Sequence, residues 1–148
     1  MRRFEVVSAY RDRGIPLPRR ATTGSAGYDL ASAEDVVVPP RSVALIPTGL
    51  KVIMPDDEFL AVYIRSSLAV RRGLMPVNGT GVIDRDYYNS PDTEGHILIA
   101  VYNRTDASVT VAQGERVAQG IFHEYRRTDD DAPGSAERRG GFGSTGSS

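Results

Sequence analysis

The sequence has no cysteine, and Lys51 is its only lysine. Without cysteine the chain has no disulfide, thiolate nucleophile or cysteine metal site, which fits a reducing compartment, so we expect a cytoplasmic protein. The formal net charge of −1 gives no basic field, which argues against general nucleic-acid binding. No apolar run is long enough to span a membrane, and no continuous apolar segment follows the two early arginines. We therefore expect neither a membrane anchor nor a signal peptide.

The apolar residues recur in short bursts with period two, as in β-strands, and not in helical stripes. Turn signals such as Pro39-Pro40 and Pro47-Thr48-Gly49 separate these bursts. Many short strands at close spacing predict an all-β domain of the sandwich, jelly-roll or barrel type. The expected strands are 36–38, 43–46, 50–53, 59–64, 97–102, 109–111 and 117–122, and the one expected helical segment is 66–72.

The composition changes at about Arg126, after which the chain has almost no apolar residues and ends ERRGGFGSTGSS. We therefore divide the chain into a β domain, residues 1–125, and a linker with a glycine-rich arm, residues 126–148. A glycine-rich end is most simply a frayed tail, because glycine loses much entropy on ordering. The alternative is an arm that wraps phosphates with its backbone N–H groups. Phe142 favours the arm, because an exposed ring is better explained if it lies on something flat.

The stretch GVIDRDY places Asp84 directly after two apolar residues, Val82 and Ile83, that we expect to be buried. A carboxylate at the edge of a dry pocket can hold and deprotonate a water molecule. A turn-forming aspartate is the commoner explanation for any single Asp, and it fits Asp86 well. Tyr87 on its own is more typical of a core or rim aromatic residue than of a ligand platform.

Three further stretches are open to a functional and a structural interpretation. RSSLA sets Arg65 beside two hydroxyls, which is either an anion site or a helix N-cap with a surface arginine. Asp29 in AGYDLAS is either a carboxylate near a metal or a cap. Gln119 in VAQGIF is a polar residue inside an apolar strand, so we expect it to need a partner. His96 and His123 lack metal-ligand spacing, and we expect both to be ordinary strand residues.

The order of the motifs is more specific than any one of them. AGYDLAS, RSSLA, GVIDRDY, RVAQGIF and RGGFGSTG resemble, in sequence and order, the five motifs of the trimeric dUTP pyrophosphatase (dUTPase) family. The resemblance runs from about Ala26 to Gly146. It implies a distorted jelly-roll β-barrel that assembles as a homotrimer, with a flexible C-terminal arm that closes the active site.

The resemblance also implies that each active site draws on three chains. One chain would supply Asp29, Arg65–Ser67 and Gln119, a second the hairpin with Asp84, and a third the arm, with Phe142 stacked on uracil. Asp84 is the implied catalytic base. The implied substrate-binding residues are Arg65, Ser66, Ser67, Asn78, Gly81, Val82, Ile83, Tyr87, Leu98, Gln119, Arg138, Arg139, Phe142, Gly143, Ser144 and Thr145.

The implied reaction is hydrolysis of dUTP to dUMP and pyrophosphate with Mg²⁺, held mainly by the triphosphate, with Asp29 helping through water. Three features depart from the family pattern: the inserted YNSPDTEGH after Tyr87, Ser67 where glycine is common, and a compressed last motif that leaves Arg138 and Arg139 as equal candidates. The alternative activity is that of dCTP deaminase, which the resemblance disfavours because its catalytic glutamate is Ala100 here. A regulatory binding protein of the same fold is the non-enzymatic alternative.

Overall fold

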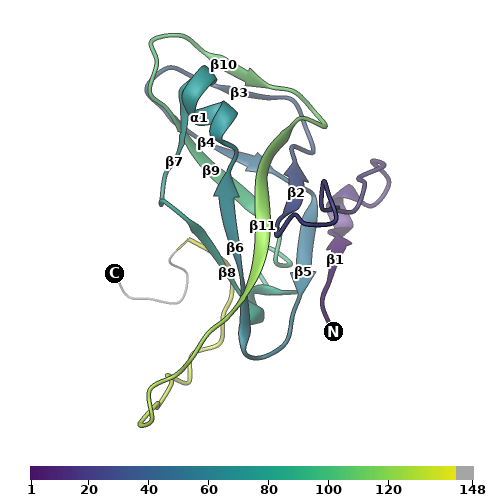
Figure 1. Cartoon of the computed structure of the whole chain (residues 1–148), viewed down its shortest axis with the longest axis vertical. Coiled ribbons are helices and arrows are strands. Elements are labelled where there is room, and N and C mark those ends of the chain that lie inside the picture. Colours follow the sequence, from purple (N-terminus) through teal and green to yellow (C-terminus); the bar gives the residue numbers. More distant parts are fainter. Residues whose placement is uncertain (143–148) are drawn as a thin grey trace.

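The computed structural model describes residues 1–142, and within them the chain is built almost entirely of β-strands (Figure 1). This confirms the all-β prediction. The elements are β1 (Arg3–Val6), η1 (Ser8–Tyr10), β2 (Tyr28–Ala31), β3 (Val36–Val38), β4 (Val43–Pro47), β5 (Leu50–Ile53), β6 (Glu58–Ile64), α1 (Ser66–Arg72), β7 (Leu74–Pro76), β8 (Gly81–Asp84), η2 (Arg85–Tyr87), β9 (Leu98–Asn103), β10 (Val109–Val111) and β11 (Arg116–Glu124).

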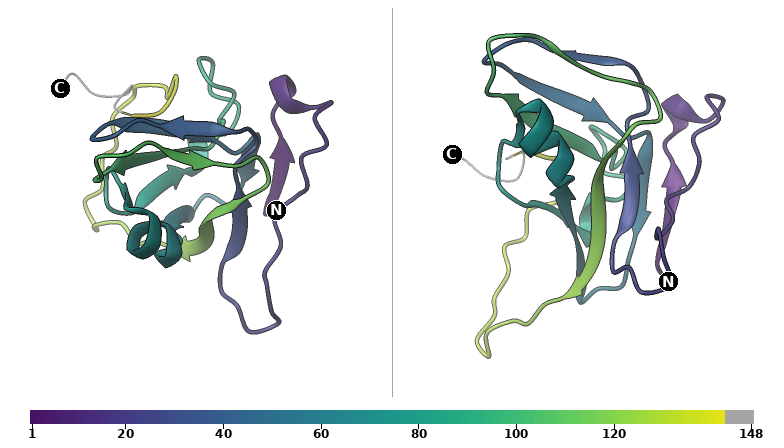
Figure 2. Two further views of the ribbon diagram at one scale, coloured as in Figure 1. Left: turned by 90° about the horizontal axis from the view of Figure 1, so that it is seen from above. Right: turned by 45° about the horizontal axis from the view of Figure 1, so that its top comes forward.

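The strands of the described region pair into four small antiparallel sheets. Their orders are β1-β5, β10-β3, β2-β11-β6-β8 and β4-β9-β7. The views in Figure 2 show these sheets wrapped around one interior, with the N-terminal segment at one side and residues 126–142 at another. Short strands that alternate apolar and polar residues favour this arrangement, because each sheet buries only one face.

The core receives side chains from every one of these sheets. Leu60 of β6, Val101 of β9 and Val111 of β10 have no exposed surface, and Val52 of β5 is 2 % exposed. Burial of each such side chain contributes roughly 1.5–3 kcal/mol of transfer free energy. The sheets are therefore held together by a shared apolar interior and not only by their hydrogen-bond ladders.

Helix α1 is the short helical segment predicted for residues 66–72. It ends because Gly73 takes the left-handed conformation (φ 71°) and its N–H donates to the Leu68 carbonyl oxygen. A Cβ atom at Gly73 would lie 2.4 Å from Cγ2 of Thr105, so glycine is required there for space as well as for conformation. This stop fixes where β7 begins, immediately before the strands that form the candidate site.

Two sequence-based expectations about burial and secondary structure were wrong. Val82 is 56 % exposed, because β8 is the edge strand of its sheet and alternation along the strand turns Val82 to the outer face. His123 lies in β11 as expected, but His96 lies in the loop before β9. There the His96 ring is half-buried, and its Nε2 accepts a hydrogen bond from the Gly49 N–H (2.8 Å).

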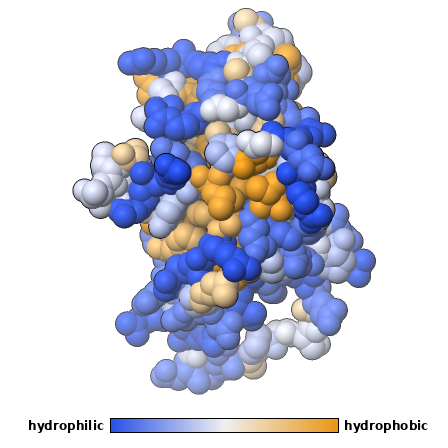
Figure 3. All heavy atoms as spheres, turned by 90° about the vertical axis from the view of Figure 1, so that its right-hand side faces the viewer, coloured by the Kyte–Doolittle hydropathy of each residue, from blue (hydrophilic) through white to orange (hydrophobic). Residues whose placement is uncertain are grey.

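The outer surface is mostly hydrophilic, with apolar side chains gathered in places. On the side of the molecule that carries β1 and β5, one apolar patch is bordered by hydrophilic residues (Figure 3). Residues 126–137 leave the end of β11, extend away from the body and return to it (Figure 1). No helix in the described part of the chain is long and apolar enough to cross a membrane.

Candidate active site

A pocket opens where β6, β8 and β9 meet the returning C-terminal segment. Its lining includes the following residues that the sequence predicted for the site: Asn78, Gly81, Val82, Ile83, Asp84, Tyr87, Leu98, Arg138 and Phe142. The fold therefore gathers residues from positions 78 to 142 at one sheet edge. Gly143, Ser144 and Thr145, which were also predicted, lie outside the described residues.

Strand β8 brings backbone and side chains to the pocket together. It pairs only with β6 in its sheet, Gly81 opposite Val62 and Asp84 opposite Phe59, so its other edge faces away from the ladder. An edge strand presents backbone N–H and C=O groups that are not used within its own sheet. These groups are suited to recognise the donor and acceptor pattern of a flat heterocycle.

Tyr87 forms the base of the pocket on the hairpin side. It is 5 % exposed, and its hydroxyl donates a hydrogen bond of 2.6 Å to the His96 carbonyl oxygen. The ring also lies directly beneath the arm, because a Cβ atom at Gly141 would be 3.3 Å from Cε1 of Tyr87. Tyr87 is thus a buried aromatic residue that also lines the pocket, and its part as a ligand platform stays a prediction.

Arg138 joins the two carboxylates of the GVIDRDY motif. Its Nη2 donates to Oδ2 of Asp84 (2.6 Å) and its Nε donates to Oδ1 of Asp86 (2.7 Å). The Arg138 side chain is only 19 % exposed, whereas both aspartate side chains are 51 % exposed. A guanidinium with two carboxylate partners therefore lines the pocket, and both carboxylates stay accessible to solvent.

The positions of the two adjacent arginines distinguish them. Arg138 lines the pocket, whereas Arg139 turns outward and donates to Oδ1 of Asp92 (3.2 Å). Phe142 also lines the pocket and is 64 % exposed, so its ring is accessible for stacking on a flat ligand. Of the two equal candidates in the last motif, the geometry therefore favours Arg138 as the one that meets a ligand.

The arm reaches the hairpin of its own chain. Glu124 at the end of β11 pairs with Glu58 of β6, and Asp84 of β8 pairs with Phe59 of β6. The end of β11 is therefore about two strand spacings, or roughly 10 Å, from Asp84. The described part of the arm can therefore reach the hairpin of its own chain, and the arm from a third chain that the resemblance implies stays a prediction.

The other predicted site residues form a second group that does not line this pocket. Arg65 precedes α1 and donates to the Arg116 carbonyl oxygen (3.4 Å), and Arg116 in turn donates to Oδ2 of Asp29 (3.2 Å). In β11, Gln119 pairs with Asp29 of β2. Ser66 is exposed and Ser67 is half-buried at the start of the same helix. This second group gathers arginines, hydroxyls and an amide, the groups that bind phosphate oxygens.

Two details of this group were not anticipated. Gln119 is exposed, so solvent can satisfy its amide, and the expected partner need not be a structural one. A Cβ atom at Gly27 would lie 2.2 Å from Oε1 of Gln119, so the glycine of AGYDLAS makes room for that side chain. Arg116 was missed, although its place in GERVAQGIF beside Gln119 was a usable signal.

The described residues contain no group of three or more His, Cys, Asp or Glu side chains that could hold a metal ion. Mg²⁺ seldom needs such a cage, because it keeps several waters and binds through one or two carboxylates together with substrate phosphates. Asp29, beside the arginines of the second group, is a carboxylate of this kind. The donor set therefore fits an ion that arrives with its substrate.

The fold and the pocket define a β-sheet protein with a pocket that residues of the C-terminal segment help to line. The family model of dUTPase matches residues 13–146. The deoxyuridine 5′-triphosphate nucleotidohydrolase of Lactococcus lactis is 49% identical over 147 residues, which cover 99% of this chain and 98% of that one. The chain belongs to the dUTPase family.

Solved structures show the same relationship. The crystal structure of the Streptococcus mutans dUTPase matches with a TM-score of 0.82 and 43% sequence identity, over 85% of this chain and 98% of that one. The structure of a mutant of the dUTPase from phage phi11 of S. aureus, which shows the coordination of a structural Mg(II) ion, matches with a TM-score of 0.74 over 93% of this chain and 99% of that one. At 20% identity the second likeness shows the fold alone.

Proposed function

We propose that this chain hydrolyses dUTP to dUMP and pyrophosphate. Membership of the dUTPase family supports this reaction, and so does the 49% identity to the L. lactis nucleotidohydrolase over nearly the whole chain. The observation that carries the proposal is the pocket, in which an edge strand, a carboxylate, a basic arm residue and an exposed ring converge. The edge strand suits the polar edge of the base, and the exposed ring suits its face. The carboxylate would act at the reacting phosphate, and the basic arm residue would bind the other phosphates.

Asp84 is the proposed general base. Its carboxylate takes a proton from a water molecule as the water oxygen forms a bond to the α-phosphorus. The bond from that phosphorus to the bridging oxygen breaks, and the electron pair leaves with pyrophosphate. Asp84 lies at the end of β8 and at the pocket edge, with 51 % of its side chain exposed, so water can reach it. A positioned base contributes a factor of roughly 10²–10⁴ in rate.

Base recognition is assigned to the edge of β8 and to its neighbours across the pocket. The backbone of Gly81, Val82 and Ile83 would bind the polar edge of uracil, with Asn78 and Leu98 completing the slot. A narrow slot excludes the thymine methyl group by sterics and the cytosine amino group by mismatched donors. Tyr87 would pack under the deoxyribose and leave no room for a ribose 2′-hydroxyl.

The triphosphate is assigned to the second group, which lies outside the pocket within one chain. Arg65, Ser66, Ser67 and Gln119 of a second copy would complete the site. This requires an oligomer, and the resemblance to the trimeric family makes it a homotrimer. An exposed apolar stripe supports such packing: Val43, Leu45, Met75 and Val77 are between 42 % and 56 % exposed. Register places this stripe across β9, because Val43 and Met75 both pair with Tyr102. It adjoins the pocket at Ala100, whose carbonyl oxygen accepts from the Val77 N–H.

Mg²⁺ is the proposed cofactor, and when bound it would neutralise charge on the triphosphate. The phosphates would hold it, with Asp29 contributing through water. The residues of this chain supply the remaining work: Arg65 and Arg138 hold phosphate oxygens and Asp84 holds the water. Residues 126–148 would act as the arm and residues 1–125 as the domain that it closes. The cytoplasmic location stays a prediction.

A pyrophosphate-release assay with dUTP, dTTP, dCTP and UTP, each with and without Mg²⁺, tests the proposal. We expect release from dUTP with Mg²⁺ and rates lower by orders of magnitude for the other three. Equal rates with dUTP and dTTP would contradict the slot. Ammonia release from dCTP would favour the deaminase alternative, which lacks support because Ala100 lines the pocket where that activity needs a carboxylate.

A further inference from the structure

We propose that residues 89–95, which we call the docking loop, hold the C-terminal arm over the pocket, with Asp92 as the positioning residue. This inference rests on the proposed function, because it assigns the loop a part in closing that site. The loop lies within the YNSPDTEGH insertion, for which the family pattern offers no role. Asp92 does not line the pocket, so it would act on the substrate only through the arm.

Asp92 contacts Arg139 through both its side chain and its main chain. Oδ1 of Asp92 accepts a hydrogen bond from Nη2 of Arg139 (3.2 Å), and the Asp92 N–H donates to the Arg139 carbonyl oxygen (2.7 Å). The side-chain pair is solvent-exposed, so it is weak by itself. Together the two contacts fix both the position and the direction of one arm residue.

The next residue, Gly140, is the one buried position among residues 126–142. A Cβ atom built on it would lie 3.4 Å from Cβ of Asp92 and 3.5 Å from Cγ2 of Thr93. A Cβ atom at this position would be in ordinary van der Waals contact with the docking loop, so the arm backbone runs alongside the loop. Gly141 continues this approach over Tyr87. The Cβ atom at Gly141 would lie 3.3 Å from Cε1 of Tyr87, which is tighter than most such contacts, so glycine favours the approach at this position.

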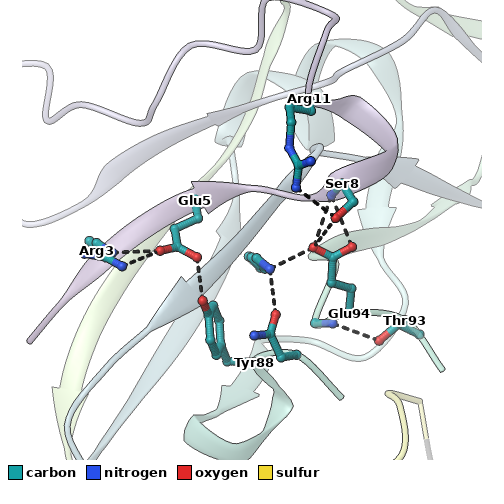
Figure 4. Close-up of polar contacts among 10 residues, drawn as sticks. Arg3, Glu5, Ser8, Arg11, Tyr88, Thr93 and Glu94 are labelled. Carbon is teal, nitrogen blue, oxygen red and sulfur yellow. Dashed lines mark hydrogen bonds and ion pairs between the residues drawn. The ribbon is translucent and has the colours of Figure 1, made fainter. Parts of the chain in front are cut away.

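The docking loop is itself fixed to the β domain by polar contacts (Figure 4). Lys51 of β5, 8 % exposed, donates to Oδ1 of Asn89 (2.6 Å) and to Oε2 of Glu94 (2.7 Å). Figure 4 shows the Glu94 carboxylate facing Ser8, whose N–H and hydroxyl both donate to it. The Tyr88 hydroxyl, just before the loop, donates to Oε1 of Glu5. The loop is therefore tied to both β5 and the N-terminal segment.

The backbone of the loop is also held in an uncommon conformation. Asn89 (φ 55°) and Glu94 (φ 60°) are non-glycine residues in the left-handed region. Such conformations persist only where the surrounding contacts determine them. At Gly95 (φ 82°) a Cβ atom would lie 2.6 Å from the Tyr87 carbonyl oxygen, so only glycine fits. The arm therefore meets a surface whose shape is set in advance, which lowers the entropy lost on closing.

The position of the docking loop explains how it would help to place arm residues at the pocket. Arg138 directly precedes Arg139, so docking of Arg139 and Gly140 brings the Arg138 side chain into the lining of the pocket, beside Asp84 and Asp86. Phe142 follows two residues later and reaches the pocket. Loss of the contact between Asp92 and Arg139 should leave every group that touches substrate unchanged. It should only make closure of the arm over the pocket less frequent.

The test uses the full-length protein with Asp92→Asn, and Asp106→Asn as the matched control. Asp106 is also an exposed aspartate paired with an arginine, Arg41 (3.1 Å), but it does not line the pocket or contact the arm. We expect Asp92→Asn to lower kcat/KM for dUTP about two- to fivefold, the range of an exposed ion pair. Asp106→Asn should leave it unchanged. Equal values for Asp92→Asn and wild type would overturn the inference.

A double-mutant cycle separates positioning from general structural damage. If Arg139 acts through Asp92, then Asp92→Asn, Arg139→Gln and the double variant should each lose the same factor. Losses that multiply in the double variant would mean that the two residues act independently, and the inference would fail. Asp92→Glu, which keeps the charge, should recover most of the lost kcat/KM.

A measurement without substrate makes failure of the dock distinguishable from failure of the proposed function. Trypsin cuts after arginine, and the bond between Arg139 and buried Gly140 should be protected while the arm is docked. Initial cleavage rates by mass spectrometry should rise about two- to fivefold in Asp92→Asn at that bond. Cleavage in the exposed linker after Arg127 should not change. An unchanged rate at Arg139 would overturn the dock even in a protein that hydrolyses dUTP.

Discussion

Asp84 and Asp86 form a natural pair of test and control. Each side chain is 51 % exposed, and each accepts a hydrogen bond from Arg138, at 2.6 Å and 2.7 Å. If both served only to hold Arg138, replacing either by asparagine would remove one exposed ion pair, which is about 0.2–1 kcal/mol. That free energy corresponds to a factor of about 1.4–5 in rate.

The proposed base predicts a different result for the two residues. Asp84→Asn should lower turnover by about 10²–10⁴, because the proton of the attacking water has no acceptor. Asp86→Asn should lower it by no more than about fivefold. In either variant Arg138 keeps its second carboxylate partner, so the arm should stay in place and nucleotide binding should change little.

The assay is dUMP formation in a single turnover, with enzyme in excess over dUTP and Mg²⁺ present. Calorimetric binding of the non-hydrolysable α,β-imido analogue of dUTP gives affinity separately from chemistry. A rate loss of the same size in both variants would mean that Asp84 only holds the arginine. A full rate in Asp84→Asn would remove the general base from the mechanism.

Three further predictions concern the arm, the assembly and pH. Removal of residues 138–148 should reduce turnover at least 100-fold, about the loss expected from one transition-state charge contact, while light scattering still finds a trimer; unchanged turnover would mean that the segment is a frayed tail. Trimers mixed at random from equal amounts of Asp84→Asn subunits and arm-deleted subunits show which chain each arm serves. If each arm serves its own chain, no subunit has both Asp84 and an arm, and the mixture should stay inactive. If the arm crosses to another chain, about one quarter of the sites should combine an intact Asp84 with an intact arm and regain activity. Burial lowers the pKa of His96, and the carboxylates of Glu34 and Glu94 oppose this only in part. The folded-state pKa therefore lies below the unfolded value of about 6.5. The contribution of neutral His96 to the free energy of unfolding is complete above that pH and is lost as pH falls through the folded pKa. His96→Gln, which keeps an acceptor for the Gly49 N–H, should flatten this acid dependence of the free energy of unfolding, and an unchanged slope in denaturant titrations would contradict it.

The strands that could be predicted are those whose own side chains fill the core. Residues 36–38, 50–53 and 109–111 were predicted with their observed limits, because apolar β-branched runs between turn residues leave little choice. Strands β1, β2, β7 and β8 were missed. They are short, and each mixes its apolar residues with charged residues, glycine or proline, so pairing with a distant partner stabilises the strand more than its local sequence does.

The residues of the candidate site also differ in how far they could be predicted from the sequence, because some depend on short motifs and others on contacts between distant segments. Short motifs predicted that Asp84, Tyr87 and Phe142 belong to the site, and all three line the pocket. Each could be predicted because a few adjacent residues define its motif. The insertion that contains the docking loop was recognised, but its role could not be predicted, because Asp92 and Glu94 gain their partners 47 and 43 residues away in the sequence. Nor could the sequence separate Arg138 from Arg139, since only the direction in which the arm approaches distinguishes two neighbouring arginines.

Hydrolysis of dUTP in water enriched in the heavy oxygen isotope tests most directly where the water attacks. Mass spectrometry of the products shows which one carries the label. If Asp84 delivers water to the α-phosphorus, the heavy oxygen appears in dUMP and the pyrophosphate stays unlabelled. Label in pyrophosphate would mean attack at the β-phosphorus, which contradicts the placement of the water between Asp84 and the nucleotide.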